Sequence, residues 1–162
     1  MRKPTIGFLF ILVIGTNAFT QSQEPQEVAT RFGALSVNDD KVLLFKGQPL
    51  QPTIEGNNSL DLGEVIPIAA TDVVLATDHG GTSCPFLYYF VNISKDGAKA
   101  TPPLGSCAEI SSIKRTPNSI TLFMPGYRGP DEPEAAQRRS AKERHVVIFR
   151  NGIVTEDGKP VR

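Results

Sequence analysis

Residues 86–91 read FLYYFV, and this unbroken apolar run constrains the fold more than any other feature of the chain. Successive side chains of a β-strand point to opposite faces of a sheet, so a strand without a polar position needs cover on both faces. The run therefore predicts a central strand of a sandwich or of a closed barrel.

The remaining apolar residues also occur in short clusters of β-branched and aromatic side chains, which is the pattern of strands. Pairs such as Asp96-Gly97, Asn151-Gly152 and Asp157-Gly158 separate them and favour tight hairpin turns. We expect a mainly β fold, an antiparallel meander that forms a small sandwich or barrel-like sheet. The expected strands are residues 42–45, 65–69, 73–76, 86–93, 110–113, 120–124 and 146–149.

One segment has the signals of a helix instead. Asp131 is a candidate N-cap, Pro133 and Glu134 suit a first turn, and basic residues follow toward the end. We expect one surface helix near residues 132–144, because its apolar residues are only alanines.

The N-terminus has the layout of a secretory signal. Met1, Arg2 and Lys3 give a basic start, residues 6–14 are almost continuously apolar, and small or polar residues follow through Ala18. The apolar run is about half the length that a bilayer-spanning helix needs, so no stable membrane span is expected after signal removal. We expect residues 1–20 to be a signal peptide, residues 21–31 a flexible leader and residues 32–162 a single β-rich domain.

Charge gives no reason to expect a nucleic-acid partner. The whole chain has 17 basic and 17 acidic residues, and removal of Arg2 and Lys3 with the signal leaves the mature domain mildly acidic. The only histidines, His79 and His145, stand far apart without neighbouring ligand pairs, so we predict neither a metal nor a cofactor.

The two cysteines, Cys84 and Cys107, are predicted to form a disulfide in an oxidising compartment, periplasmic or extracellular. The alternative is a catalytic thiol at Cys84 with His79 as its base. A second cysteine in an oxidising compartment favours the disulfide.

A candidate binding surface combines a loop with the predicted helix. The loop contributes Asp78, His79, Gly80, Gly81 and Thr82, with Ser83 beside them. The helix contributes Arg138, Arg139 and Lys142. Gly80-Gly81 lacks the lysine and the following helix of a phosphate-binding loop, and Ser83 lacks the second glycine of a hydrolase elbow, so neither chemistry is predicted.

The chain resembles a group of small exported proteins of Gram-negative bacteria that have no assigned activity. The resemblance covers roughly the C-terminal half from Asp72, and it implies the periplasm without transferring any catalytic residue. Its residues are Gly80-Gly81-Thr82-Ser83-Cys84-Pro85, Tyr88, Phe90-Val91 and Gly105-Ser106-Cys107.

The sequence leaves three functions open. The first is a non-catalytic periplasmic or secreted binding protein, an inhibitor or immunity-type protein for a protein partner. The second is a small secreted hydrolase with a cleft built from Asp72, Asp78, His79 and Thr82. The third is an envelope structural component that makes contact through the basic helix.

Overall fold

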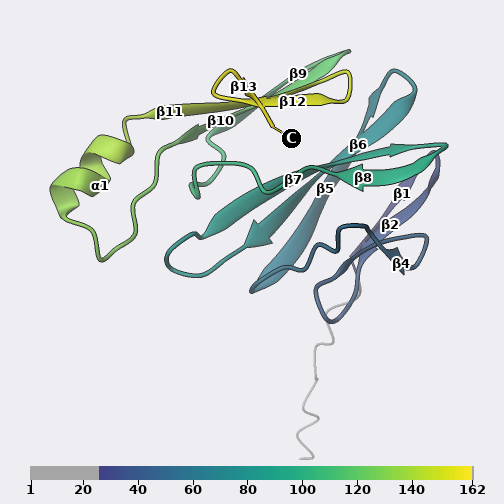
Figure 1. Ribbon diagram of the computed structural model, residues 1–162, viewed down its shortest axis with the longest axis horizontal. Helices are drawn as coiled ribbons and strands as arrows, with labels where there is room; N and C mark the ends of the chain where they lie inside the picture. Colours follow the sequence, from purple (N-terminus) through teal and green to yellow (C-terminus); the bar gives the residue numbers. More distant parts are fainter. Residues whose placement is uncertain (1–25, 162) are drawn as a thin grey trace, which may run out of the picture.

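The computed structural model describes residues 26–161, which form three antiparallel sheets and one short helix (Figure 1). Each sheet consists of strands that follow one another in the chain and pair with their sequence neighbours. The predicted mainly β fold with a meander of antiparallel strands is therefore confirmed, and the sheets pack as a sandwich.

The first sheet pairs four strands in chain order: β1 (Glu27–Thr30), β2 (Gly33–Val37), β3 (Leu43–Phe45) and β4 (Gln48–Pro49). The middle sheet does the same with β5 (Ser59–Ile68), β6 (Thr71–His79), β7 (Phe86–Ser94) and β8 (Gly97–Ala100). The third sheet has the order β13-β12-β11-β10-β9. Its strands are β9 (Ser112–Thr116), β10 (Ser119–Pro125), β11 (Arg144–Arg150), β12 (Ile153–Glu156) and β13 (Lys159–Pro160).

The middle sheet is buried on both faces. In β7, Val91 and Ile93 belong to a core cluster with Leu35 and Leu43 of the first sheet. Tyr88 and Phe90 of the same strand belong to a second cluster with residues of the third sheet, including Leu122 and Phe149. Alternate side chains thus enter two separate cores, as the apolar run of residues 86–91 predicts.

The predicted strands all overlap observed ones, but their number and some bounds were wrong. Residues 110–113 were expected as a strand, whereas β9 begins at Ser112. Ile110 lies outside because its backbone N–H donates to the Tyr88 hydroxyl at 3.0 Å, which turns the chain toward the middle sheet. The sequence pattern did not reveal the short strands β1, β2, β4, β8, β12 and β13.

The expected leader extends too far into the domain. Residues 27–30 of the predicted leader form β1, which pairs with β2 in a tight antiparallel hairpin. The Gln26 side chain also donates to and accepts from the backbone of Leu62, at 3.3 and 2.7 Å. Val28 of β1 packs against the core, and the alternate residues of the strand can be polar because the first sheet is an outer layer. The predicted signal peptide, residues 1–20, lies outside the described residues.

The predicted helix is present but shorter. Helix α1 spans Glu134–Ser140, and it begins after Pro133 without a side-chain cap, so Asp131 is not the N-cap. Within residues 26–161 no helix combines the length and the apolarity that crossing a bilayer requires.

A buried carboxylate joins the first sheet to the middle sheet. The Asp72 side chain is 1% exposed and accepts from the Arg31 Nε and from the Arg31 backbone N–H, each at 2.7 Å. Arg31 also donates to the carbonyl of Thr71 at 2.6 Å. The β1–β2 turn is thereby fixed on the β5–β6 turn.

We expect Arg31→Ala to lower the free energy of unfolding by about 3 kcal/mol, because it leaves a buried carboxylate without its counter-charge. Urea unfolding measures the change. Arg115→Ala is the matched control, since Arg115 pairs with Glu64 between exposed side chains and its loss should cost less than about 1 kcal/mol. Equal losses in both variants would contradict a specific role for the Arg31–Asp72 pair.

Candidate functional site

The loop between β6 and β7 is a narrow turn with an exposed tip. The Gly80 N–H donates to the Pro85 carbonyl at 2.8 Å, and the Cys84 N–H donates to the Gly81 carbonyl at 3.1 Å. A Cβ at Gly80 would lie 2.1 Å from the Cys84 carbonyl oxygen, so the turn requires glycine there. Gly81, Thr82 and Ser83 are exposed, and we call these three residues the tip.

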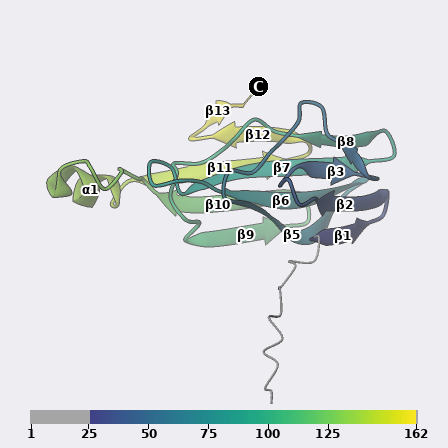
Figure 2. The same cartoon turned by 90° about the horizontal axis from the view of Figure 1, so that it is seen from below.

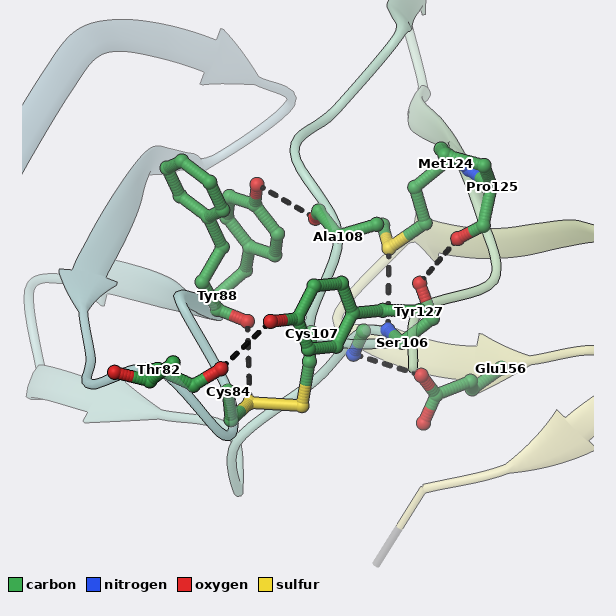
Figure 3. The surroundings of a disulfide bond; sticks show 12 residues. Thr82, Cys84, Tyr88, Ser106, Cys107, Ala108, Met124, Pro125, Tyr127 and Glu156 are labelled. Carbon is green, nitrogen blue, oxygen red and sulfur yellow. Dashed lines mark hydrogen bonds between the residues drawn. A yellow bond between two sulfur atoms is a disulfide. The ribbon is translucent and has the colours of Figure 1, made fainter. Parts of the chain in front are cut away.

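The disulfide between Cys84 and Cys107 ties the tip to the segment that follows β8 (Figure 3). The predicted disulfide is confirmed, with the two Cα atoms 4.7 Å apart, and the alternative of a catalytic thiol at Cys84 is wrong. A disulfide-bonded pair is compatible with an oxidising, non-cytoplasmic compartment.

Tyr88 holds the segment that follows the disulfide. Its hydroxyl donates to the Ala108 carbonyl at 3.1 Å (Figure 3). The same hydroxyl accepts from the Ile110 N–H at 3.0 Å. Burial of the ring raises the pKa of Tyr88 from 10.0 to about 12, since the phenolate would lose its hydration. The neutral phenol therefore keeps the chain after Cys107 against the middle sheet.

Tyr127 links the tip to the chain that leads into helix α1. Its hydroxyl donates to the Thr82 carbonyl at 2.6 Å (Figure 3). On the other side of Tyr127, the Gly126 N–H donates to the Ser140 carbonyl at 3.1 Å. A Cβ at Gly126 would lie 2.5 Å from the Ser140 hydroxyl oxygen, so glycine permits this close approach to the helix end.

Helix α1 extends beyond the ends of the sheets, on the side of the molecule where the tip lies (Figures 1 and 2). Ser140 is its only buried residue, whereas Arg138, Arg139 and the following Lys142 are exposed. Arg138 donates to Glu134 at 2.7 Å across one helical turn. The structure thus brings the two parts of the predicted surface to the same end of the domain.

Asp78 is the exception among the predicted surface residues. It is buried, and its carboxylate accepts from the Asn57 N–H at 2.8 Å, so it fixes a neighbouring loop and is not available on the surface. His79 is half-buried, with its Nε2 2.8 Å from Asp61 and its ring edge against Phe86. The exposed part of the predicted loop is therefore Gly81 and Thr82.

Asp72 lies apart from the other residues of the predicted hydrolase cleft, Asp78, His79 and Thr82. Asp72 and Asp78 stand near opposite ends of β6, about 20 Å apart along an extended strand, and each is bound to a different backbone segment. Within the described residues, no group of three or more possible metal-ligating side chains lies in one place.

A shallow recess that the sequence did not suggest lies where β9, β10 and β11 meet the chain from helix α1. Its volume is about 340 Å³. Ser111, Ser112, Phe123, Met124, Pro125, Glu143 and Arg144 line it. The Arg144 guanidinium lies over the Phe123 ring, 4.5 Å from its centre. In the sequence, only Phe123 could have indicated this recess, because it is a large apolar residue between the core residues Leu122 and Met124 and so faces away from the core.

Comparisons with protein family models, curated proteins and solved structures found no match. The geometry of the described residues is therefore the basis of the functional argument.

Replacement of both cysteines by alanine should lower the free energy of unfolding by about 2–5 kcal/mol, because the unfolded chain loses a cross-link. Denaturant unfolding of native and variant protein measures the difference. Free-thiol titration of the native protein should find almost no thiol. Labelling of Cys84 without reductant would contradict the disulfide.

The free energy of unfolding should fall as the pH rises from 10 to about 12. The folded chain binds the Tyr88 proton more tightly than the unfolded chain does, so the contribution of Tyr88 is complete below pH 10 and is lost as the pH approaches its folded pKa. Tyr88→Phe should reduce this decline and cost about 1–3 kcal/mol at neutral pH. A smaller decline should remain, because burial also raises the pKa of Tyr89. Urea unfolding across that pH range tests both effects.

Proposed function

We propose that the chain is a non-catalytic binding protein of a periplasmic or secreted compartment, an inhibitor or immunity-type protein that recognises a protein partner. The contact surface is the tip together with helix α1. Exposed loops held by a rigid scaffold are the usual means by which small β domains bind other proteins.

One observation carries the proposal: the Tyr127 hydrogen bond to Thr82 joins two exposed segments that lie far apart in the sequence. The disulfide holds the same loop at Cys84. Binding by preformed segments costs less conformational entropy than binding by mobile ones. The arrangement therefore suits recognition of a partner without rearrangement of the domain.

The charge of helix α1 and of the residues after it indicates how this part of the surface would contribute to partner binding. Arg139 and Lys142 are exposed and have no acidic partner among the ion pairs of the described residues. Basic side chains of this kind accelerate association with an acidic surface and give the binding a dependence on ionic strength.

Co-purification from periplasmic extract, followed by affinity measurements with the purified partner, tests the proposal. The tip variant Thr82→Gly/Ser83→Gly and the helix variant Arg139→Glu/Lys142→Glu should each weaken binding by about tenfold or more. Lys95→Glu/Lys99→Glu is the control for the helix variant, because it makes the same change of charge on the β7–β8 hairpin at the far end of the middle sheet.

The proposal fails if neither the tip variant nor the helix variant changes the affinity, or if the control weakens binding as much as they do. A purified partner that the domain chemically alters would replace the binding function with a catalytic one.

A further inference from the structure

The third sheet is apolar on both faces, although only one of them is covered within the described residues. In β11, Val147 and Phe149 enter the core against the middle sheet. Val146 and Ile148 alternate with them and point to the opposite face, and they belong to neither core cluster. The continuous run VVIF is the pattern of a strand that is covered on both sides.

Neighbouring strands extend this outer apolar face. Phe123 of β10 stands directly opposite Val146, and Ile148 stands between Thr121 of β10 and Thr155 of β12. Ile153 follows at the β11–β12 hairpin, opposite Arg150, and is 65% exposed. We call Thr121, Phe123, Val146, Ile148, Ile153 and Thr155 the outer face.

The first sheet shows what a solvent-facing sheet in this domain looks like. In β2 the inward residues Leu35 and Val37 enter the core, and the alternate residues Ala34 and Ser36 are small or polar. On the outward side of the sheet, Glu27 pairs with Ser36 and Ala29 with Ala34, and Leu44 of β3 stands between Ser36 and Pro49. The first sheet thus has one large apolar side chain on its outward side, Leu44, whereas the third sheet has four there, Phe123, Val146, Ile148 and Ile153.

Basic residues outnumber acidic ones around the outer face. Three basic residues occupy outward positions of β9 and β11. Lys114 stands opposite Thr121, Arg150 stands opposite Ile153, and Arg144 lines the recess. The outward positions of β9, β10, β11 and β12 include no acidic residue. Two acidic residues border the face outside these strands: Glu143 lies at the recess, and the Asp157 carboxylate accepts from the Val146 N–H at 2.8 Å. The surface is thus an apolar centre with a rim in which basic residues predominate.

We propose that the outer face is a second docking surface, and that its occupant is a protein that presents apolar side chains surrounded by acidic ones. The recess of about 340 Å³ at one end of the face receives a large side chain of that protein beside Phe123 and Arg144. This surface does not depend on the tip and helix α1, which lie at the end of the domain and not on the sheet.

Two other occupants fit less well. A second copy of the chain would place identical, predominantly basic rims against each other, since a two-fold contact brings the same patch of both subunits together. A lipid surface would match the positive charge, but Phe123, Val146 and Ile148 are half-buried in a flat layer of strands and only Ile153 projects. A layer of this shape is complementary to the side chains of another protein.

Selection from a displayed library of random peptides tests the chemistry of the occupant directly. Peptides are selected for binding to the native domain, and those that also bind the variant Ile148→Asp are removed. Circular dichroism first confirms that this variant is folded. We expect enriched peptides to combine Asp or Glu with Val, Ile or aromatic residues.

Arg150→Glu should weaken the binding of a synthetic peptide of this type by about tenfold. Lys99→Glu, which makes a similar charge change at an exposed position of β8, should leave it unchanged.

The tip variant Thr82→Gly/Ser83→Gly should bind the same peptide as tightly as the native domain, which separates this surface from the one proposed above. Failure to enrich peptides over Ile148→Asp, or enrichment without acidic residues, overturns the proposal. Binding to vesicles of phosphatidylglycerol that Arg150→Glu abolishes would assign the face to lipid. Concentration-dependent dimers that Arg150→Glu disrupts would assign it to a second copy.

Discussion

The domain depends on the double burial of its middle sheet. A sheet whose strands carry apolar residues on both faces has no face to offer to water, so it requires a cover on each side. The first and third sheets supply these covers, and Val91 and Phe90 of one strand enter different cores. Two further sets of contacts attach these outer sheets to the middle sheet. The ion pair of Arg31 with Asp72 holds the first sheet, and the disulfide and the Tyr88 hydroxyl hold the chain that leads to the third sheet.

The sequence was most informative where a pattern is local. The apolar run at residues 86–91 predicted a strand with both faces covered, and the clusters of β-branched residues located seven strands because each is marked by its own composition. The short strand β1 was missed, since its sequence has a single large apolar residue, Val28, and its order depends on pairing with β2, on packing of Val28 against the core and on the contact of Gln26 with Leu62. The helix was placed correctly but overextended, because its expected cap, Asp131, makes no capping contact.

In the candidate site, too, the sequence predicted local features and missed long-range contacts. Local composition pointed to the exposed Gly81 and Thr82 and to the basic helix. It did not reveal that Asp78 is buried, because the partner of its carboxylate is the backbone of Asn57 in a loop that precedes β5. Nor did it reveal the Tyr127–Thr82 contact, which joins segments separated by 45 positions in the chain. Long-range contacts of this kind depend on the stacking order of the layers, which a single sequence does not display.

The layers follow one another in the order in which the chain is made. Every strand of the first sheet precedes the middle sheet, and every strand of the third follows it. Each sheet closes through hairpins between neighbouring strands, and such local pairings form faster than distant ones. When the chain folds from its N-terminal end, the middle sheet is therefore complete, with Phe90 on its still uncovered face, before β10 and β11 bury it. Exposed apolar sheet surface is prone to aggregation. The interval between β8 and β11 is thus the stage at which the folding chain most needs protection from its neighbours.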